Sequence, residues 1–227
     1  MQPYFFPYIG YFQLIASVDT FIVYDNIKFT KKGWINRNRM LVNGSDSMFS
    51  LPLKKDSDSL NIIQRELATD FDRAKLISKF IGAYRRAPYF SQTFPLLERV
   101  ILNGEGNLFR YLHNSLVETC RHLGIDSDVR VSSSIAIDHD LKSQEKVLAI
   151  CAAMGADKYI NTIGGIELYK RNDFTTHGIE LQFIKTKPFQ YSQFDNSFVP
   201  WLSIIDVLMF NSLDTVRASV HSNYELI

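Results

Sequence analysis

Cysteine, net charge and long apolar stretches are all scarce in this chain of 227 residues, and each shortage excludes a class of protein. The two cysteines, Cys120 and Cys151, lie in helix-like stretches without CxxC spacing, which argues against a disulfide framework and fits a reducing cytoplasm. The formal charge is only +1, from 25 basic and 24 acidic side chains, and this disfavours broad binding to nucleic acid or membrane surfaces. The longest apolar run, residues 202–210, is interrupted by polar side chains and is far too short to span a membrane.

Metal-binding patterns are absent from the sequence as well. Among the five histidines, His113 and His122 are nine residues apart in a helical stretch, more than two turns separated, and the others show no ligand spacing. We therefore expect a cytoplasmic protein with no metal site, no nucleic-acid partner and no membrane span.

Strand and helix patterns alternate along most of the chain. Residues 19–25 are rich in β-branched and aromatic side chains, as a buried strand is, and Asn43-Gly44 predicts a tight hairpin turn. Apolar residues at helical spacing predict a helical section in the middle of the chain. The expected helices are 10–18, 72–87, 94–103, 108–123, 143–154, 203–210 and 212–220, and the expected strands are 19–25, 39–42, 48–53, 129–131, 157–160 and 178–184.

This alternation predicts an α/β fold with a mainly parallel, Rossmann-like sheet, flanking helices and a helical insertion. We expect residues 1–227 to form a single α/β domain in which residues 72–123 are the mostly helical insertion. Ligands of such folds bind at the carboxyl ends of the strands, so polar residues that follow a strand become the candidate site residues.

The first 39 residues hold a dense set of aromatic, proline and amide groups that fits neither a core strand nor a core helix. Rings that stack and amides that donate and accept suit a flat, polar ligand such as a sugar or nucleotide. Guanidinium groups can hold its phosphates or carboxylates in bidentate fashion. The substrate-binding candidates in this part of the chain are Gln2, Tyr4, Tyr8, Tyr11, Trp34, Arg37, Asn38 and Arg39.

The segment Tyr8-Ile9-Gly10-Tyr11 has the spacing of the His-x-Gly-His signature of some nucleotidyltransferases, with tyrosine in place of both histidines. A phenol stays neutral near pH 7 and cannot supply imidazolium charge to a phosphate, so adenylyl transfer by that route is disfavoured. Tyr8 and Tyr11 can equally well pack the start of a helix.

Three further groups lie at the ends of expected strands. Asp25 is a candidate general base, or it caps the next turn. In the triple serine at 132–134, Ser133 and Ser134 can contact a phosphate or cap a helix, and Ser133 and Asn36 are candidate oxyanion donors. After the strand at 157–160, the candidates are Asn161, Gly164, Gly165 and Tyr169, with a plain turn as the alternative for the glycines.

The chain resembles the WbqC-like family of bacteria in three strings: Gln-Pro-Tyr-Phe-Phe-Pro-Tyr-Ile-Gly-Tyr-Phe-Gln at 2–13, Val-Tyr-Asp-Asn at 23–26 and Gly-Trp-Ile-Asn-Arg-Asn-Arg at 33–39. Later stretches such as Arg-Ala-Pro-Tyr-Phe at 86–90 agree with it. The resemblance implies cytoplasmic work on an activated amino sugar for surface polysaccharide, such as the O-antigen of lipopolysaccharide. Similar sequences carry apolar residues ahead of the first string, which would form a first strand; here we expect that strand to be missing or supplied otherwise.

The resulting hypothesis is an N-acyl or aminoacyl transferase that acts on the amine of a nucleotide-linked amino sugar. It needs an activated acyl or aminoacyl donor, either a thioester or an adenylate, and an acyl carrier protein is a further candidate partner. Positioning and oxyanion donors can supply much of the rate enhancement, so we expect neither an obligatory metal nor a covalent enzyme intermediate. The alternatives are a nucleotidyltransferase-like enzyme and a non-catalytic binding or scaffold protein of the same pathway.

Overall fold

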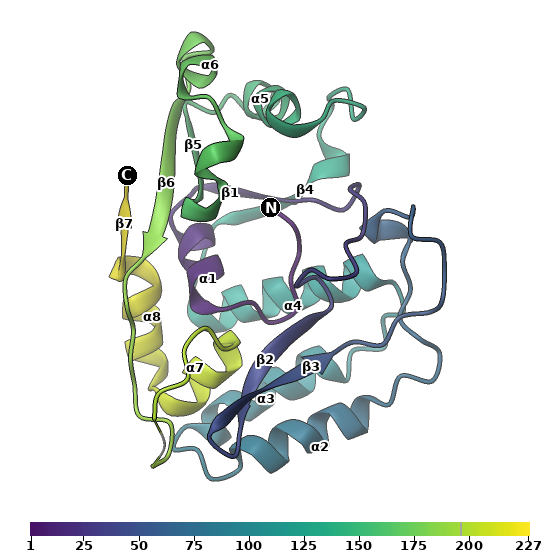
Figure 1. Ribbon diagram of the computed structural model, residues 1–227, viewed down its shortest axis with the longest axis vertical. Coiled ribbons are helices and arrows are strands. Elements are labelled where there is room, and N and C mark those ends of the chain that lie inside the picture. The colour runs from purple at the N-terminus through teal and green to yellow at the C-terminus, as the bar shows by residue number, and fades with distance from the viewer. Residues whose placement is uncertain (196) are drawn as a thin grey trace.

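The computed structural model describes residues 1–195 and 197–227 and shows a mixed α/β fold (Figure 1). Its α-helices are α1 (Ile9–Ala16), α2 (Arg73–Tyr84), α3 (Phe90–Ile101), α4 (Leu108–Leu123), α5 (Ser143–Met154), α6 (Arg171–Thr176), α7 (Ile204–Phe210) and α8 (Leu213–Ser222). Its strands are β1 (Thr20–Val23), β2 (Arg37–Val42), β3 (Ser45–Ser50), β4 (Asp128–Val131), β5 (Lys158–Thr162), β6 (Glu180–Thr186) and β7 (Tyr224–Leu226). Three short 3-10 helices are η1 (Ile62–Gln64), η2 (Ser132–Ser134) and η3 (Ile163–Leu168).

The strands form three small sheets rather than the one mainly parallel sheet expected from the sequence, so a Rossmann-like fold is not confirmed. Strand β1 pairs with β4 in parallel, β5 pairs with β6 in parallel, and β7 adds to β6 in antiparallel fashion. On its other edge β1 contacts the start of the chain, because Met1 N donates to Ile22 O and Tyr24 N donates to Met1 O. Met1 therefore occupies positions where a neighbouring strand would pair with β1.

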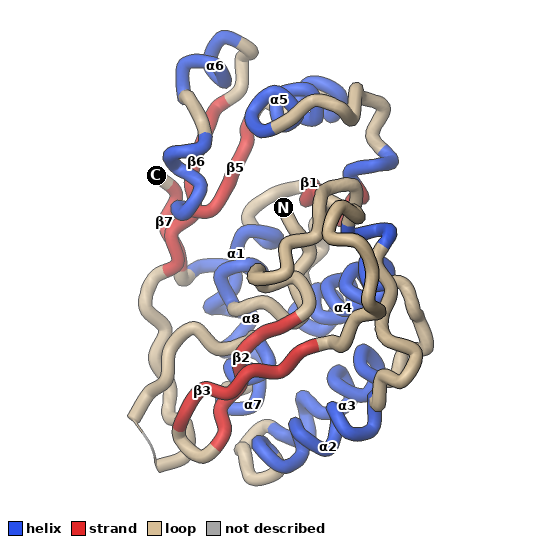
Figure 2. Tube along the Cα trace, turned by 45° about the vertical axis from the view of Figure 1, so that its right-hand side comes forward, coloured by secondary structure: helices blue, strands red, loops and turns tan. Residues whose placement is uncertain are grey.

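The β2–β3 hairpin confirms the turn expected at residues 43–44. Asn43 and Gly44 have φ angles of +51° and +77°, the left-handed values that a two-residue hairpin turn requires. Figure 2 shows this hairpin beside α2 and α3 at one end of the molecule, whereas α5, α6 and the β5–β6–β7 sheet lie at the other end.

One helix in the middle of the chain begins earlier than the sequence indicated. We expected a helix over 94–103, and α3 spans Phe90–Ile101. The extra first turn is held by the stacked rings of Phe90 and Phe94, 4.9 Å apart, and by Thr93 Oγ1, which donates to Leu208 O at 2.9 Å. That residues 72–123 are an insertion into the domain stays a prediction.

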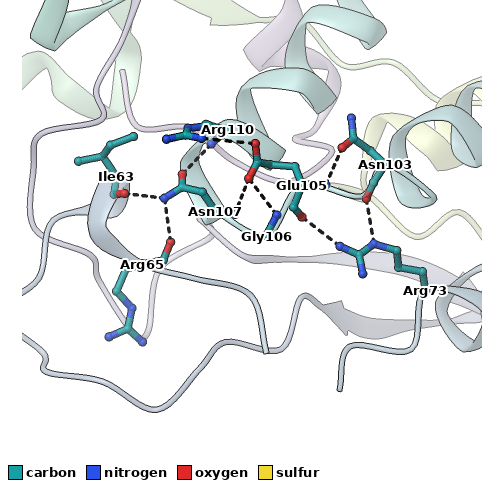
Figure 3. Close-up of polar contacts among 8 residues, drawn as sticks. All are labelled: Ile63, Arg65, Arg73, Asn103, Glu105, Gly106, Asn107 and Arg110. Atoms are coloured by element: carbon teal, nitrogen blue, oxygen red, sulfur yellow. Dashed lines mark hydrogen bonds and ion pairs between the residues drawn. The ribbon is translucent and has the colours of Figure 1, made fainter. Parts of the chain in front are cut away.

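Hydrogen bonds fix the connection between α3 and α4 (Figure 3). Arg73 donates to Asn103 O at 2.9 Å and to Glu105 O at 3.0 Å, and the side chain of Asn107 accepts from Arg110 N as the N-cap of α4. The same asparagine donates to Ile63 O at 2.6 Å. The start of α4 is thereby joined to η1, which lies in the N-terminal third of the chain.

One large hydrophobic core unites helices α1 to α4, α7 and α8 with β1 and the β2–β3 hairpin. A second, smaller cluster lies between α5, α6 and β6 and includes Val147, Cys151, Phe174 and Phe183. Gly10 permits the contact between α1 and the end of β6, because a Cβ at this position would lie 2.5 Å from Thr186 Oγ1. The carboxyl end of β6 therefore sits directly against the N-terminal motif.

Candidate functional site

The carboxyl ends of β1 and β4 bring Asp25 and the triple serine together. Because the two strands run in parallel with Val23 opposite Val131, the residues that follow them lie side by side. Asp25 is 2% exposed, and its Oδ1 accepts from Ser132 Oγ at 2.9 Å and from Ser133 N at 3.0 Å. In the described part of the chain, both of these side-chain contacts are made by Oδ1, and no protein group donates a hydrogen bond to Oδ2.

The hydroxyls of the triple serine have different surroundings. Ser132 Oγ is buried and lies 2.8 Å from Asn26 Oδ1 as well as near Asp25, so its single proton is shared between two acceptors. Ser134 Oγ donates to Val131 O at 2.7 Å, as a local turn contact. Ser133 Oγ has no hydrogen-bond partner among the described residues and is exposed beside Asp25.

Sequence reasoning missed a buried lysine in this neighbourhood. Lys146, in the first turn of α5, is only 7% exposed; its Nζ donates to His139 O at 3.2 Å and lies 5.8 Å from the centre of the Tyr24 ring. The side chain of Asn26 donates to His139 Nδ1 at 3.0 Å, which connects the lysine to Ser132. We call Asp25, Asn26, Ser132, His139 and Lys146 the strand-end cluster.

The charge of Lys146 is not neutralised inside the protein. Among residues 1–195 and 197–227, none of the ion pairs includes Lys146. A buried ammonium without a carboxylate partner is costly, and such groups gather at binding and catalytic sites. The sequence did offer a signal, because Lys146 falls at helical spacing with Ile150 and next to Val147, on the apolar face of α5.

The predicted group after β5 forms its own hydrogen-bonded set. The side-chain amide of Asn161 donates to the hydroxyls of Tyr159 and Tyr169, each at 3.0 Å. Burial, with Tyr169 nearby, raises the pKa of Tyr159 well above its ordinary value, so this phenol stays protonated. A methyl group on Gly164 would contact nothing within 4 Å and one on Gly165 would make only van der Waals contacts, so packing requires glycine at neither position.

Trp34 and Arg39 lie together, as the binding hypothesis required. The guanidinium carbon of Arg39 is 5.7 Å from the centre of the Trp34 ring, and Nη2 donates to Trp201 O at 3.1 Å. Both tryptophans are exposed, Trp34 by 41% and Trp201 by 64%. A weak ion pair of 3.4 Å to Asp46 also holds Arg39, so this cation is already partly neutralised.

A cavity of about 340 Å³ opens where β6 ends; Trp201 lines it, whereas neither Trp34 nor Arg39 is among its lining residues. Its walls include the side chains of Tyr8, Lys187, Phe189, Tyr191, Phe198 and Trp201. The rings of Tyr8 and Trp201 are 5.9 Å apart in an edge-on arrangement. Of the tyrosines predicted in the N-terminal motif, Tyr8 is the one that lines this cavity.

The other two tyrosines of the motif shape the N-terminal segment. Tyr11 is 2% exposed and its hydroxyl donates to Gln2 O at 2.7 Å, while its ring lies 5.6 Å from that of Tyr4. The hydroxyl of Tyr4 contacts Gln2 Oε1 at 3.4 Å. Burial raises the pKa of Tyr11 well above its usual value, in keeping with a packing role in the core.

Arg37 is held by its own loop. Its Nε donates to Gly33 O at 2.9 Å and its Nη2 donates to Lys32 O at 2.6 Å. A guanidinium has five donors, so two bonds to carbonyls leave others free for a ligand. In the described residues no contact joins Arg37 to Arg39 or to the cavity, and its part in phosphate binding stays a prediction.

The two asparagines of the motif both donate to backbone carbonyls. Asn36 donates to Leu51 O at 2.8 Å, and the buried Asn38 donates to Phe5 O at 3.2 Å and to Phe6 O at 2.9 Å. Asn38 thus satisfies two carbonyls of the N-terminal motif, where Phe6 has a φ of +41°. No described contact joins either asparagine to the strand-end cluster, so their roles as oxyanion donor and ligand contact stay predictions.

A buried carboxylate supports the wall of the cavity. Asp206 is fully buried and accepts from the hydroxyls of Tyr84 at 2.8 Å and Tyr191 at 2.7 Å, and from Gln193 Nε2 at 2.7 Å. Burial raises the pKa of the Asp206 carboxyl, and the three donors partly oppose that rise. Through Tyr191, which lines the cavity, this network fixes one of its aromatic walls.

Comparison with known proteins places this geometry in a family. Residues 2–218 match the WbqC-like protein family, which is nearly the whole chain. The chain belongs to this family. It is also 26% identical over 214 residues to a Mycobacterium tuberculosis (strain ATCC 25618 / H37Rv) protein titled "Uncharacterized protein Rv1507c", covering 93% of this chain and 91% of that protein. No solved structure matches the chain.

Two structural features have no counterpart in the described residues. No three His, Cys, Asp or Glu side chains gather there as metal ligands would. No helix in the same residues is long and apolar enough to cross a membrane. The groups available for chemistry are a carboxylate, a hydroxyl and an ammonium at the strand ends, and aromatic rings with one arginine beside the cavity.

Proposed function

We propose that this WbqC-like protein transfers an acyl or aminoacyl group to the amine of a nucleotide-linked amino sugar. The observation that carries the proposal is the strand-end cluster, in which a buried carboxylate with one free oxygen and a buried, unneutralised ammonium belong to one hydrogen-bonded set. We further propose that the reaction occurs in the cytoplasm, during assembly of a surface polysaccharide such as an O-antigen.

The reaction asks for proton removal and charge stabilisation. The neutral sugar amine attacks the carbonyl carbon of a thioester or acyl adenylate, forming a C–N bond, and the C–S or C–O bond then breaks as the thiolate or AMP leaves with the electron pair. Asp25 Oδ2 takes the proton that the attacking nitrogen loses. The Lys146 ammonium and the Ser133 hydroxyl stabilise the negative charge on the carbonyl oxygen in the tetrahedral intermediate.

Hydrogen bonds already orient these groups. Ser132 and the Ser133 amide hold Asp25 Oδ1, and His139 O holds Lys146. Preorganised groups of this kind need little rearrangement during reaction, which is a main source of rate enhancement. The donor can arrive on a small thiol or on an acyl carrier protein.

The test is an acyl-transfer assay on a panel of uridine and thymidine diphosphate amino sugars, with acyl thioesters or aminoacyl adenylates as donors, read by the mass of the product. We expect Asp25→Asn to lower kcat by about 10²- to 10⁴-fold, the usual contribution of a general base. The side-chain oxygen of asparagine still accepts from Ser132, so the variant should keep its melting temperature within a few degrees. Asp19→Asn, at the exposed residue just before β1, is the matched control and should keep full activity.

Two outcomes would sink the transferase proposal: no acylated product from any sugar and donor, or full activity in Asp25→Asn. Release of pyrophosphate from a nucleoside triphosphate with magnesium would instead identify a nucleotidyltransferase. A non-catalytic binding protein is the second candidate, favoured by three exposed apolar side chains on η3, Ile163, Ile166 and Leu168, which are 38%, 46% and 69% exposed. Such a protein would show no thermal shift with any nucleotide sugar.

A further inference from the structure

The cavity at the end of β6 is walled mainly by flat rings. The ring centre of Tyr191 lies 5.1 Å from that of Phe198 and 5.6 Å from that of Phe189, and the rings of Tyr8 and Trp201 meet edge-on with centres 5.9 Å apart. Its volume of about 340 Å³ falls in the range of small-molecule sites, and most of these are lined by aromatic and apolar side chains with a few polar groups.

Trp201 holds a conformation that packing alone does not explain. It is 64% exposed and has a φ of +61°, a left-handed value that a bulky residue adopts only under constraint. Arg39 supplies the constraint, since Nη2 donates to Trp201 O and Arg39 O accepts from Ser203 N at 2.9 Å. Arg39 thus holds the backbone of Trp201, whose exposed indole is part of the cavity wall.

The polar groups beside the rings point to the chemical class of the ligand. Thr186 and Gln190 line the cavity and can hydrogen-bond to the edge of a heterocycle, and Lys187 adds a cation at the same place. Lys187 joins no ion pair among the described residues. An acyl chain would contact the apolar walls but would leave the polar side chains and the cations without a partner. A nucleobase that carries a diphosphate would stack on the rings, hydrogen-bond to the polar side chains and pair its phosphates with the cations.

We propose that this cavity binds the base of a nucleoside diphosphate, stacked against Trp201 and Tyr8, with Lys187 and Arg39 facing its phosphates. The proposal deepens the function above and depends on it only for the identity of the sugar attached to the diphosphate. Met1 pairs with Tyr24 beside the strand-end cluster and Tyr8 lines the cavity, so the seven residue steps from Met1 to Tyr8 keep these two Cα atoms within about 25 Å.

The experiment uses tryptophan fluorescence, because the chain contains only Trp34 and Trp201. In Trp34→Phe, Trp201 is the sole reporter, and titration with uridine, thymidine, adenosine or guanosine diphosphate should quench it to saturation for at least one base. In calorimetry of the full chain, Trp201→Ala should lower affinity for that nucleotide about 5- to 150-fold, the usual worth of one base–aromatic stack. Trp201→Phe should restore most of it, and Leu168→Ala, at another exposed apolar residue, should change nothing.

Any of four results would overturn the base site. The first three are inorganic pyrophosphate binding as tightly as every nucleoside diphosphate, unchanged affinity in Trp201→Ala, and displacement of the nucleotide by octanoate, which would assign the cavity to an acyl chain. The same holds if no nucleoside diphosphate quenches Trp201. If the nucleotide binds as described but no acyl transfer occurs, the transferase proposal fails and the base site stands. If acyl transfer occurs but Trp201→Ala binds the nucleotide as tightly as the parent, the base site fails and the transferase proposal stands.

Discussion

Replacing Tyr84 by phenylalanine tests the buried network behind the cavity wall. The Tyr84 hydroxyl donates to Asp206 Oδ1 at 2.8 Å and accepts from Leu41 N at 2.9 Å, and all three groups are buried. The substitution keeps the ring and removes only the oxygen. It therefore weakens the solvation of a buried carboxylate and leaves a buried N–H without an acceptor.

The expected loss follows from these two effects. A hydrogen bond to a charged group contributes about 1.5–3 kcal/mol, and a buried unsatisfied donor costs about 1–3 kcal/mol, so Tyr84→Phe should lower the free energy of unfolding by about 3 kcal/mol near neutral pH. Tyr111→Phe is the matched control, because this equally buried hydroxyl donates to the neutral carbonyl of Ile101 at 3.1 Å. Its loss should be about 1 kcal/mol.

The effect of Tyr84→Phe should also depend on pH, and the sign can be worked out. Burial raises the pKa of Asp206 above its ordinary 3.8, so the folded protein binds this proton more tightly than the unfolded chain. The carboxyl thus favours folding most below its unfolded pKa, and this contribution is lost as pH rises through the folded pKa. Removing a donor to the charged form raises the folded pKa further, so the variant loses more stability at high pH than at low pH.

Urea unfolding of both variants and the parent at about pH 8 and about pH 4.5 measures this difference, which we expect to be about 1–2 kcal/mol larger at the higher pH for Tyr84→Phe. Tyr111→Phe should show the same loss at both values. A pH-independent loss for Tyr84→Phe, equal to that of the control, would refute the assignment of a charged Asp206 to the network.

Three further predictions concern stability elsewhere. Burial, with two nearby arginines, lowers the pKa of His122, so the unfolded chain binds more protons than the folded protein and stability should fall as pH drops below about 6.5. In urea unfolding, His122→Gln should reduce this dependence of stability on pH. An unchanged dependence would show that His122 is not its source. Gly10→Ala should cost about 1–3 kcal/mol, because its Cβ would lie 2.5 Å from both Thr186 Oγ1 and the Tyr8 ring. Thr186→Ala removes one of these two clashes and should recover part of the loss in thermal unfolding; no recovery would leave the Tyr8 ring as the source of the loss. Asn107→Ala removes the N-cap of α4 and the donor to Ile63 O, and should lower stability in thermal unfolding by about 2 kcal/mol. A loss below about 0.5 kcal/mol would show that water replaces both hydrogen bonds.

Elements fixed by neighbouring residues were predictable from the sequence. Helix α4 spans Leu108–Leu123 as expected, because Asn107 caps its start and Gly124, with a φ of +68°, ends it. The turn at Asn43-Gly44 was likewise readable from two residues. The grouping of the strands into sheets could not be predicted in this way. Pairing between distant segments, such as the contact of Met1 with β1, leaves no mark in local sequence patterns.

The candidate site divides in the same way. Asp25 and Ser133 could be foreseen together, since both follow strands and parallel strands end at one edge. The cavity could not, because it depends on the strained backbone of Trp201 and on Arg39, which is 162 residues away in sequence. Lys146 was predictable in principle from its place on the apolar face of α5, but a single lysine is ordinarily taken as solvated.

The N-terminal motif shows why aromatic density alone is an ambiguous signal. Most of its rings are core residues, and Phe5 and Phe6 are fully buried. Two side chains hold the left-handed turn at Phe6. The Asn38 amide and the Ser203 hydroxyl both donate hydrogen bonds to Phe6 O. The motif begins at Met1, which is hydrogen-bonded to the end of β1, and reaches the cavity at the end of β6 with Tyr8. Its buried rings therefore mainly fix a short connection between two places where a ligand can bind. A substitution in its buried rings should then alter binding at both places, whereas one at Tyr8 should alter binding at the cavity alone.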